Sequence, residues 1–191
     1  MKRKEEILSY IGVVILLLIL SGRFSNAADG KSTVTTLETR HTQVFFQTEA
    51  DVWTFDKKIS SELSAAGLST LSAVENGDDS AARLTRKIDG LFGRVQEVLD
   101  MRKAMEKVQI NVYSNKNALQ AAYNKFQSGK CRIRAWYVFE ENSVYVSAAD
   151  VNAGMLGHEL AHAIIDHFFQ VRPPKATAEI LARYVDRHID N

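Results

Sequence analysis

Two histidines four residues apart, His158 and His162, constrain this chain more than any other feature of its sequence. On an α-helix, residues at that spacing project from the same face one turn apart, so both imidazoles can reach one metal ion. Glu159 follows the first histidine and projects about 100° further round the helix. Its carboxylate would lie beside the metal, where it can accept a proton from a bound water. The pattern predicts half of a catalytic metal site together with its general base.

A catalytic zinc site takes three protein ligands and leaves a fourth position for water, so one ligand is still needed. His167 lies nine residues after His158, about 180° round the same helix, and would face away. Pro173-Pro174 predicts a tight turn into a second helix, and Glu179 stands just over one turn into that helix. Asp186 lies seven residues further along the same face and could instead orient a ligand histidine.

Three stretches carry a family resemblance: Gly157–Ile164, Pro173-Pro174 and Ala178–Val185. Together they resemble the gluzincin, or peptidase MA-like, zinc metalloproteases, the broad group that includes thermolysin. The resemblance covers roughly residues 154–185. It implies that Zn²⁺ is bound by three ligands and that a glutamate is the general base. The ligands would be His158, His162 and Glu179, and the base Glu159.

The same resemblance supplies one further candidate for catalysis. Gluzincins have a tryptophan-leucine pair before the third ligand and a glycine after it, where this chain has Ala176-Thr177 and Ile180. A donor normally stabilises the oxyanion during peptide hydrolysis. Tyr184 is the first choice for that role because it follows Glu179 in the family-like motif. The other possible donors in the sequence are Tyr137, Tyr145, Arg183 and His188.

In gluzincins the strand just before the metal helix usually lies along the cleft and pairs with an extended substrate. Ser143–Ser147 is the corresponding strand here, and we expect it at the edge of the sheet. Larger gluzincins add a helical lobe after the third ligand, whereas this sequence ends twelve residues beyond Glu179. The cleft is therefore expected either to be open to flexible chains or to be closed by a partner or second copy.

Hydrophobic periodicity predicts an α+β domain with a small, mostly antiparallel sheet packed with helices. The resemblance implies that this is a zincin-like catalytic domain. Cys131 is the single cysteine, so it cannot form an internal disulfide. No internal repeat or second domain is visible. The expected elements before the metal helix are strands within 32–48, helices at 53–63 and 84–99, a strand at 108–113, a helix at 115–127 and a hairpin of 133–139 with 143–147.

The first 27 residues have the features of an export signal: basic residues at 2–4, an apolar run from Ile11 to Leu20 and the small-residue sequence Ser25-Asn26-Ala27. The apolar run is shorter than the roughly 20 residues that span a bilayer. Cleavage is favoured, and an uncleaved signal anchor is the alternative. Residues 28–191 then form a single domain that is periplasmic or secreted, and a membrane is involved only if the signal segment is retained.

Charge excludes some classes of partner. The whole chain has 24 basic and 23 acidic residues, and the part after residue 27 has 20 and 21. A nearly neutral domain gives no electrostatic reason to expect binding to nucleic acid.

These observations predict an exported zinc metalloprotease that hydrolyses peptides or unfolded proteins. One alternative is a catalytically inactive, protease-like zinc-binding domain that binds a peptide or protein partner. The other is a structural domain in which the two-histidine pattern is accidental, since that short pattern has false positives. An intact Glu159 favours catalysis, because a pure binding domain needs no base beside the metal.

Overall fold

The structure is a computed structural model that describes residues 34–65, 80–126 and 134–189. All of them belong to one compact unit, residues 32–191. The predicted export signal and Cys131 lie outside the described residues. No described helix is long and apolar enough to cross a membrane.

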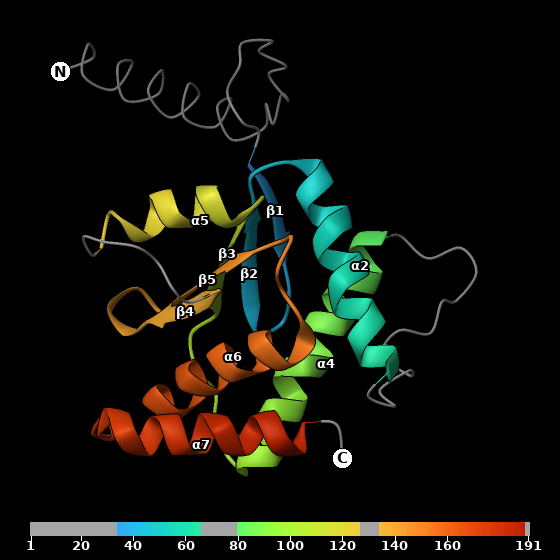
Figure 1. Ribbon diagram of the computed structural model, residues 1–191. Coiled ribbons are helices and arrows are strands. Elements are labelled where there is room, and N and C mark those ends of the chain that lie inside the picture. The colour runs from blue at the N-terminus through green and yellow to red at the C-terminus, as the bar shows by residue number, and fades with distance from the viewer. Residues whose placement is uncertain (1–33, 66–79, 127–133, 190–191) are drawn as a thin grey trace, which may run out of the picture. The chain divides into compact units, whose positions relative to one another are not determined.

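The described residues form a five-stranded sheet and five α-helices, which confirms the α+β class (Figure 1). The elements follow in the order β1 (Thr35–Glu38), β2 (Thr42–Phe46), α2 (Glu49–Ala65), α4 (Ser80–Leu99), β3 (Val108–Tyr113), α5 (Lys116–Tyr123), β4 (Ala135–Val138), the 3₁₀ turn η1 (Phe139–Glu141), β5 (Ser143–Ser147), α6 (Ala153–Phe168) and α7 (Lys175–His188).

The sheet is mixed, so the prediction of a mostly antiparallel sheet is wrong. Its order is β1-β2-β3-β5-β4, with β2, β3 and β5 parallel and the two outer pairs antiparallel. The chain leaves β2 through helices α2 and α4 before it enters β3, and such a helical crossover joins parallel strands. The 133–147 hairpin was expected to be antiparallel, and β4 and β5 do pair in that way.

The position of β5 also corrects an expectation. Ser143–Ser147 lies between β3 and β4, so it is an interior strand and cannot take up an extended substrate. The edge on that side of the sheet is β4, Ala135–Val138. Any backbone pairing with a peptide at this side therefore belongs to β4.

Alternating side chains divide the sheet into two faces. Val144 and Val146 of β5 join the main core, which is formed with α2, α4, α6 and α7. Tyr145 points to the other face and packs with Trp136 and with Leu119 of α5 in a smaller cluster. Helix α5 thus covers one face of the sheet, α2, α4 and α6 cover the other, and α7 packs on α6 and α4.

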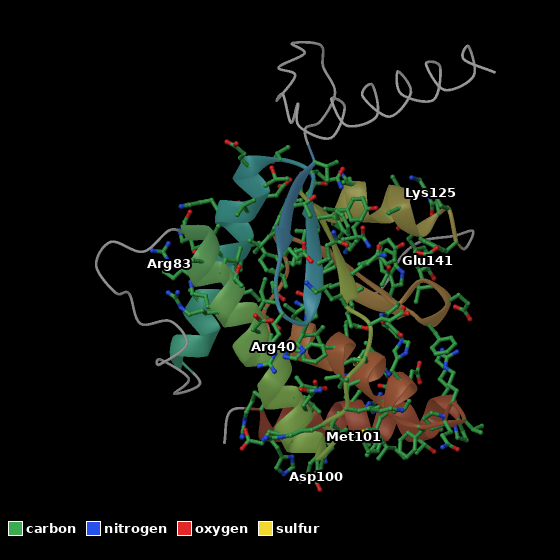
Figure 2. All side chains as sticks on the ribbon, turned by 180° about the vertical axis from the view of Figure 1, so that it is seen from behind. Arg40, Arg83, Asp100, Met101, Lys125 and Glu141 are labelled. Carbon is green, nitrogen blue, oxygen red and sulfur yellow. The ribbon has the colours of Figure 1, made fainter. Side chains whose placement is uncertain are left out.

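Helix α4 ends with a tight reversal that returns the chain to β3. Asp100 has a positive φ of 52°, and the Met101 N–H donates to the Gln96 carbonyl at 2.9 Å. This is the left-handed helix end that releases the chain into a new direction. Figure 2 shows Asp100 and Met101 at that end of α4.

Helix α6 lies at the centre of the main core and contacts α2, α4, α7, β4 and β5. We expect Leu160→Ala to lower the free energy of unfolding by about 2–5 kcal/mol, since Leu160 is fully buried. Urea denaturation followed by circular dichroism measures the change. Ile180→Ala is the control, because Ile180 is 68% exposed and its loss should cost less than about 0.5 kcal/mol. Equal losses in the two variants would contradict the central position of α6.

Candidate metal centre

Helix α6, which carries the two histidines, begins with a side-chain N-cap. Asn152 caps the helix, and its side-chain oxygen accepts a hydrogen bond from the Met155 N–H at 2.6 Å. The sequence-predicted helix therefore exists and begins about one and a half turns before His158. His158 and His162 are partly exposed, whereas Leu156 and Leu160 on the opposite side are fully buried.

The second predicted helix returns alongside the first. Residues 169–174 form the connection, Pro174 caps α7, and α7 packs along α6. The buried residues of α7 are Ala178, Ala182 and Val185, and the small side chains of the two alanines let the helices approach closely. The adjacent Glu179 is thereby held opposite the two histidines, as the proline turn predicted.

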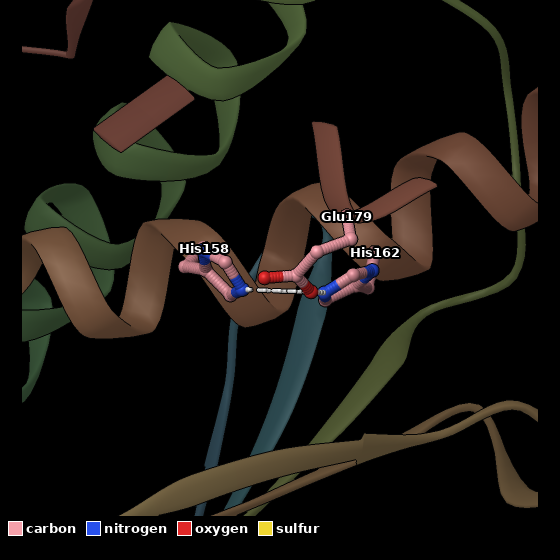
Figure 3. Close-up of side chains that lie close together, drawn as sticks. All are labelled: His158, His162 and Glu179. Atoms are coloured by element: carbon pink, nitrogen blue, oxygen red, sulfur yellow. Dashed lines mark hydrogen bonds and ion pairs between the residues drawn. The ribbon is translucent and has the colours of Figure 1, made fainter. Parts of the chain in front are cut away.

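Three side-chain atoms meet at one point (Figure 3). Nε2 of His158 and Nε2 of His162 are 3.2 Å apart, and Oε2 of Glu179 lies 3.9 Å from the first and 3.5 Å from the second. Two ligands bound tetrahedrally to zinc at 2.0–2.1 Å are about 3.3–3.4 Å apart. His158, His162 and Glu179 thus have the spacing that a small tetrahedral cation needs, and they could hold a metal ion.

Asp186 lies behind the first histidine. Its carboxylate oxygens are 3.0 and 3.2 Å from Nδ1 of His158, the ring nitrogen that does not face the cluster. A proton on Nδ1 can be donated to Asp186, which leaves the lone pair of Nε2 pointing at the centre of the cluster. Of the two roles open to Asp186, the geometry supports orientation of His158.

Glu159 is buried at 9% exposure and faces the same cavity as the histidines. Burial is the main cause that raises the pKa of its carboxyl to about 7, and the carboxylates of Glu179 and Asp186 add to it. His158 and a hydrogen bond from the Tyr137 backbone act in the opposite direction. A bound cation would lower this pKa, so the feature that suits a general base is the position of the buried carboxyl at the cavity beside the two histidines.

The surroundings of Glu179 and His162 favour the charge states that metal binding needs. The hydrogen bond from Arg183, at 2.8 Å, is the main cause that lowers the pKa of Glu179, so this side chain stays a carboxylate. Burial lowers the pKa of His162, which favours the neutral imidazole that binds metals.

The site opens into a cavity of about 660 Å³. Strand β4 forms one wall with residues 135–137, and α6 and α7 form the others. The cavity continues past the cluster to Asp166, Arg172 and Lys175. It is large enough for several residues of a peptide, since ligand pockets of this kind usually measure about 300–1,000 Å³.

The expected oxyanion donors are not all at this cavity. Tyr184 does not line it: this residue is stacked on His188 at 4.0 Å, and five residues after Glu179 it points about 140° away from that ligand. Tyr145 lies on the α5 face of the sheet and bonds Glu141. Tyr137 does line the cavity. It is the tyrosine of the three that the structure brings to the site.

His167 also lies apart from the cluster, as predicted. Its Nε2 is 3.3 Å from the Tyr137 hydroxyl, and its ring stacks on Phe139 at 5.8 Å.

Two residues near the cavity were missed by the sequence analysis. Asp166 is buried at 6% exposure and forms an ion pair with Arg172 at 2.9 Å. One signal was available for Asp166, because it stands four residues after His162 and so continues the stripe of the two histidines. Nothing in the spacing pointed to Arg172, which lies in the connection between the helices.

Comparisons of the chain with protein-family models, with curated proteins and with solved structures found no significant match. The interpretation of the site therefore depends on its own geometry and chemistry.

The raised pKa of Glu159 has a consequence for stability. Its folded pKa, about 7, lies above its ordinary value of 4.5. Between these pH values the folded state holds a proton that the unfolded chain has lost, so the free energy of unfolding falls as pH rises through this window. The shift corresponds to roughly 3 kcal/mol at pH 8.

Glu159→Gln has no carboxyl to titrate and should stabilise the metal-free protein by up to about 3 kcal/mol at pH 8 but not at pH 4. Urea denaturation in chelator at both pH values measures this. Glu106→Gln, at an exposed position, is the control and should give no such pH-dependent difference. A Glu159→Gln effect that is the same at both pH values would contradict a raised pKa.

Proposed function

We propose that this chain is an exported, zinc-dependent peptidase of the gluzincin type with a zincin-like catalytic domain. The observation that carries the proposal is the tetrahedral spacing of His158, His162 and Glu179 with a buried carboxyl, Glu159, at the same cavity. An accidental pair of histidines gives no reason for a third ligand at the right distance, nor for a carboxylate that orients His158.

Zinc bound by these three residues would polarise a peptide carbonyl and lower the pKa of a water molecule. Glu159 would accept the proton of the attacking water and pass it to the leaving amine nitrogen. Asp186 would hold the ring of His158 in its ligating orientation. The roles of His158, His162, Glu179 and Glu159 are thus those that the sequence predicted.

The substrate class follows from the edge of the sheet. β4 contributes residues 135–137 to the cavity wall and pairs on its other side with β5. An extended peptide can add to such an edge through main-chain hydrogen bonds, which suits peptides and unfolded proteins. Export to a periplasmic or extracellular compartment is proposed from residues 1–27 of the sequence alone.

Two tyrosines can be compared as candidates for oxyanion stabilisation. Tyr184 was the choice by resemblance, yet it is 47% exposed and stacks on His188. Tyr137 does line the cavity, but its hydroxyl lies 3.3 Å from Nε2 of His167, which lies apart from the cluster. The backbone of Tyr137 bonds Glu159, the proposed base.

Metal content is the first measurement. We expect the purified full-length protein to bind one zinc ion, and Glu179→Ala to lose most of that zinc because two imidazoles alone bind weakly. Elemental analysis after dialysis measures the content. Glu106→Ala removes a carboxylate at an exposed position away from the cavity and should keep the metal. Purified wild-type protein that contains no zinc would contradict the proposed metal site.

Cleavage of unfolded casein tests catalysis. We expect the zinc-loaded protein to cleave casein, and a chelator to abolish the cleavage. Glu159→Gln should keep its zinc but cleave casein about 10²–10⁴ times more slowly, because glutamine cannot accept the proton of the water. Gel electrophoresis and mass spectrometry follow the products. Zinc binding without cleavage would favour the inactive, partner-binding domain.

A further inference from the structure

The end of the cavity beyond His162 is cationic. It is lined by Arg172 and Lys175, with Asp166 as the one acidic residue there. The proposed metal site borders the same cavity one helical turn away, since His162 precedes Asp166 and Glu179 follows Lys175 by four residues, so a substrate bound across the zinc could extend towards these two cations.

Arg172 is held in one orientation by two contacts. Its Nε and Nη2 lie 3.0 and 2.9 Å from the same oxygen of Asp166, and its guanidinium carbon lies 4.3 Å from the centre of the Phe139 ring. The side chain is nevertheless half exposed. Nη1 has no ion-pair partner within the described ranges 34–65, 80–126 and 134–189. A guanidinium fixed in this way presents a free edge that matches the geometry of a carboxylate.

The N-terminus of α7 adds to the positive electrostatic potential at this end of the cavity. Pro174 caps α7 without a side-chain hydrogen bond, and its carbonyl oxygen accepts from the N–H groups of Thr177 and Ala178, so the N–H groups of Lys175 and Ala176 are the ones that the cap residue leaves unbonded. Lys175 is the first helical residue, is exposed, and has no carboxylate within ion-pair distance among the residues described. Helix dipole, lysine and arginine all favour an anion at this end.

The distance between the metal site and Arg172 determines which residue of the substrate Arg172 could contact. Asp166 follows His162 by one helical turn, a rise of about 6 Å, and Arg172 is bonded directly to it. An extended peptide advances about 3.3–3.6 Å per residue. The hydrogen bonds that Arg172 makes add to this length, so a group held by Arg172 would belong to a residue within a few positions of the bond at the metal.

We propose that Arg172, assisted by Lys175, is a specificity site for a carboxylate of the substrate within a few residues of the cleaved bond. The inference rests on the proposed peptidase function and adds the chemistry of the substrate. The carboxylate comes either from an aspartate or glutamate side chain or from the C-terminus of the peptide. Asp166 acts as a positioning residue, since it reaches the substrate only through Arg172.

Binding rather than turnover tests the proposal, because it can be measured when hydrolysis is blocked. The zinc-loaded full-length Glu159→Gln protein is titrated with fluorescein-labelled alanine pentapeptides, and affinity is read by fluorescence anisotropy. One pair compares the C-terminal free acid with the amide. A second pair, both amidated, compares a central aspartate with a central asparagine. The two pairs distinguish a terminal carboxylate from a side-chain carboxylate.

Variants in this background separate recognition from a structural ion pair. Arg172→Gln removes the cation but leaves Asp166 buried without its partner. The double variant Asp166→Asn/Arg172→Gln removes both charges and avoids that penalty. Arg172→Lys retains the charge without the planar fork. Arg187→Gln removes an exposed arginine of α7 that does not line the cavity and is the matched control.

At least one carboxylate peptide should bind about tenfold more tightly than its neutral partner, as expected for a charge-assisted hydrogen bond. This preference should fall below about twofold in Arg172→Gln and in the double variant, recover in part in Arg172→Lys, and persist in Arg187→Gln. A structural ion pair alone would change thermal stability but not the ratio within a pair.

Equal binding within both pairs, a preference that survives in the double variant, or no binding of any peptide overturns the proposal. Failure of the peptidase function is recognised separately, by the absence of zinc or of casein cleavage in the wild type. Casein cleavage without a carboxylate preference would overturn only the specificity site.

Discussion

The close packing of α7 against α6 is the contact on which the candidate site depends. It rests on small residues: Ala178 and Ala182 are buried on α7, and a Cβ at Gly157 of α6 would lie only 2.5 Å from Cδ1 of Ile189, just after α7. Because the helices approach so closely, the carboxylate of Glu179 on α7 can reach the two imidazoles on α6. A wider separation would keep all three residues but lose their tetrahedral spacing.

Helix α6 buries two carboxylates, and the protein treats them differently. Asp166 is compensated by Arg172, which lies within 2.9 Å. Glu159 forms no ion pair with a lysine or arginine in the part of the chain that the structure describes, and its pKa rises to about 7. A buried acid that is left without a strong partner costs stability, which natural sequences accept mainly at functional sites. The contrast on one helix distinguishes a structural carboxylate from one that is available for proton transfer.

The spacing of residues along single helices predicted most residues of the candidate site. Prediction failed for the pairing of strands that are distant in the sequence. His158, Glu159 and His162 followed from helix geometry, and Glu179 followed from the proline turn and the returning helix. The elements of the sheet were also predicted, yet not their order. Sequence order placed 143–147 next to the metal helix but could not show that it lies between β3 and β4. Tyr184 was chosen by its place in a motif, although helix geometry points it away from Glu179.

One face of α6 contributes to the stability of the fold, and the other carries the polar residues of the candidate site. One face supplies Leu156, Leu160 and Ile164 to the core, while the stripe of His158, His162 and Asp166 replaces apolar contacts with polar ones. A ligand that binds only the folded state returns part of this cost, by about 4 kcal/mol at a thousand times its Kd. If zinc is that ligand, the free energy of metal binding and that of α6–α7 packing are linked. The metal would then stabilise the same helix contact that forms its site.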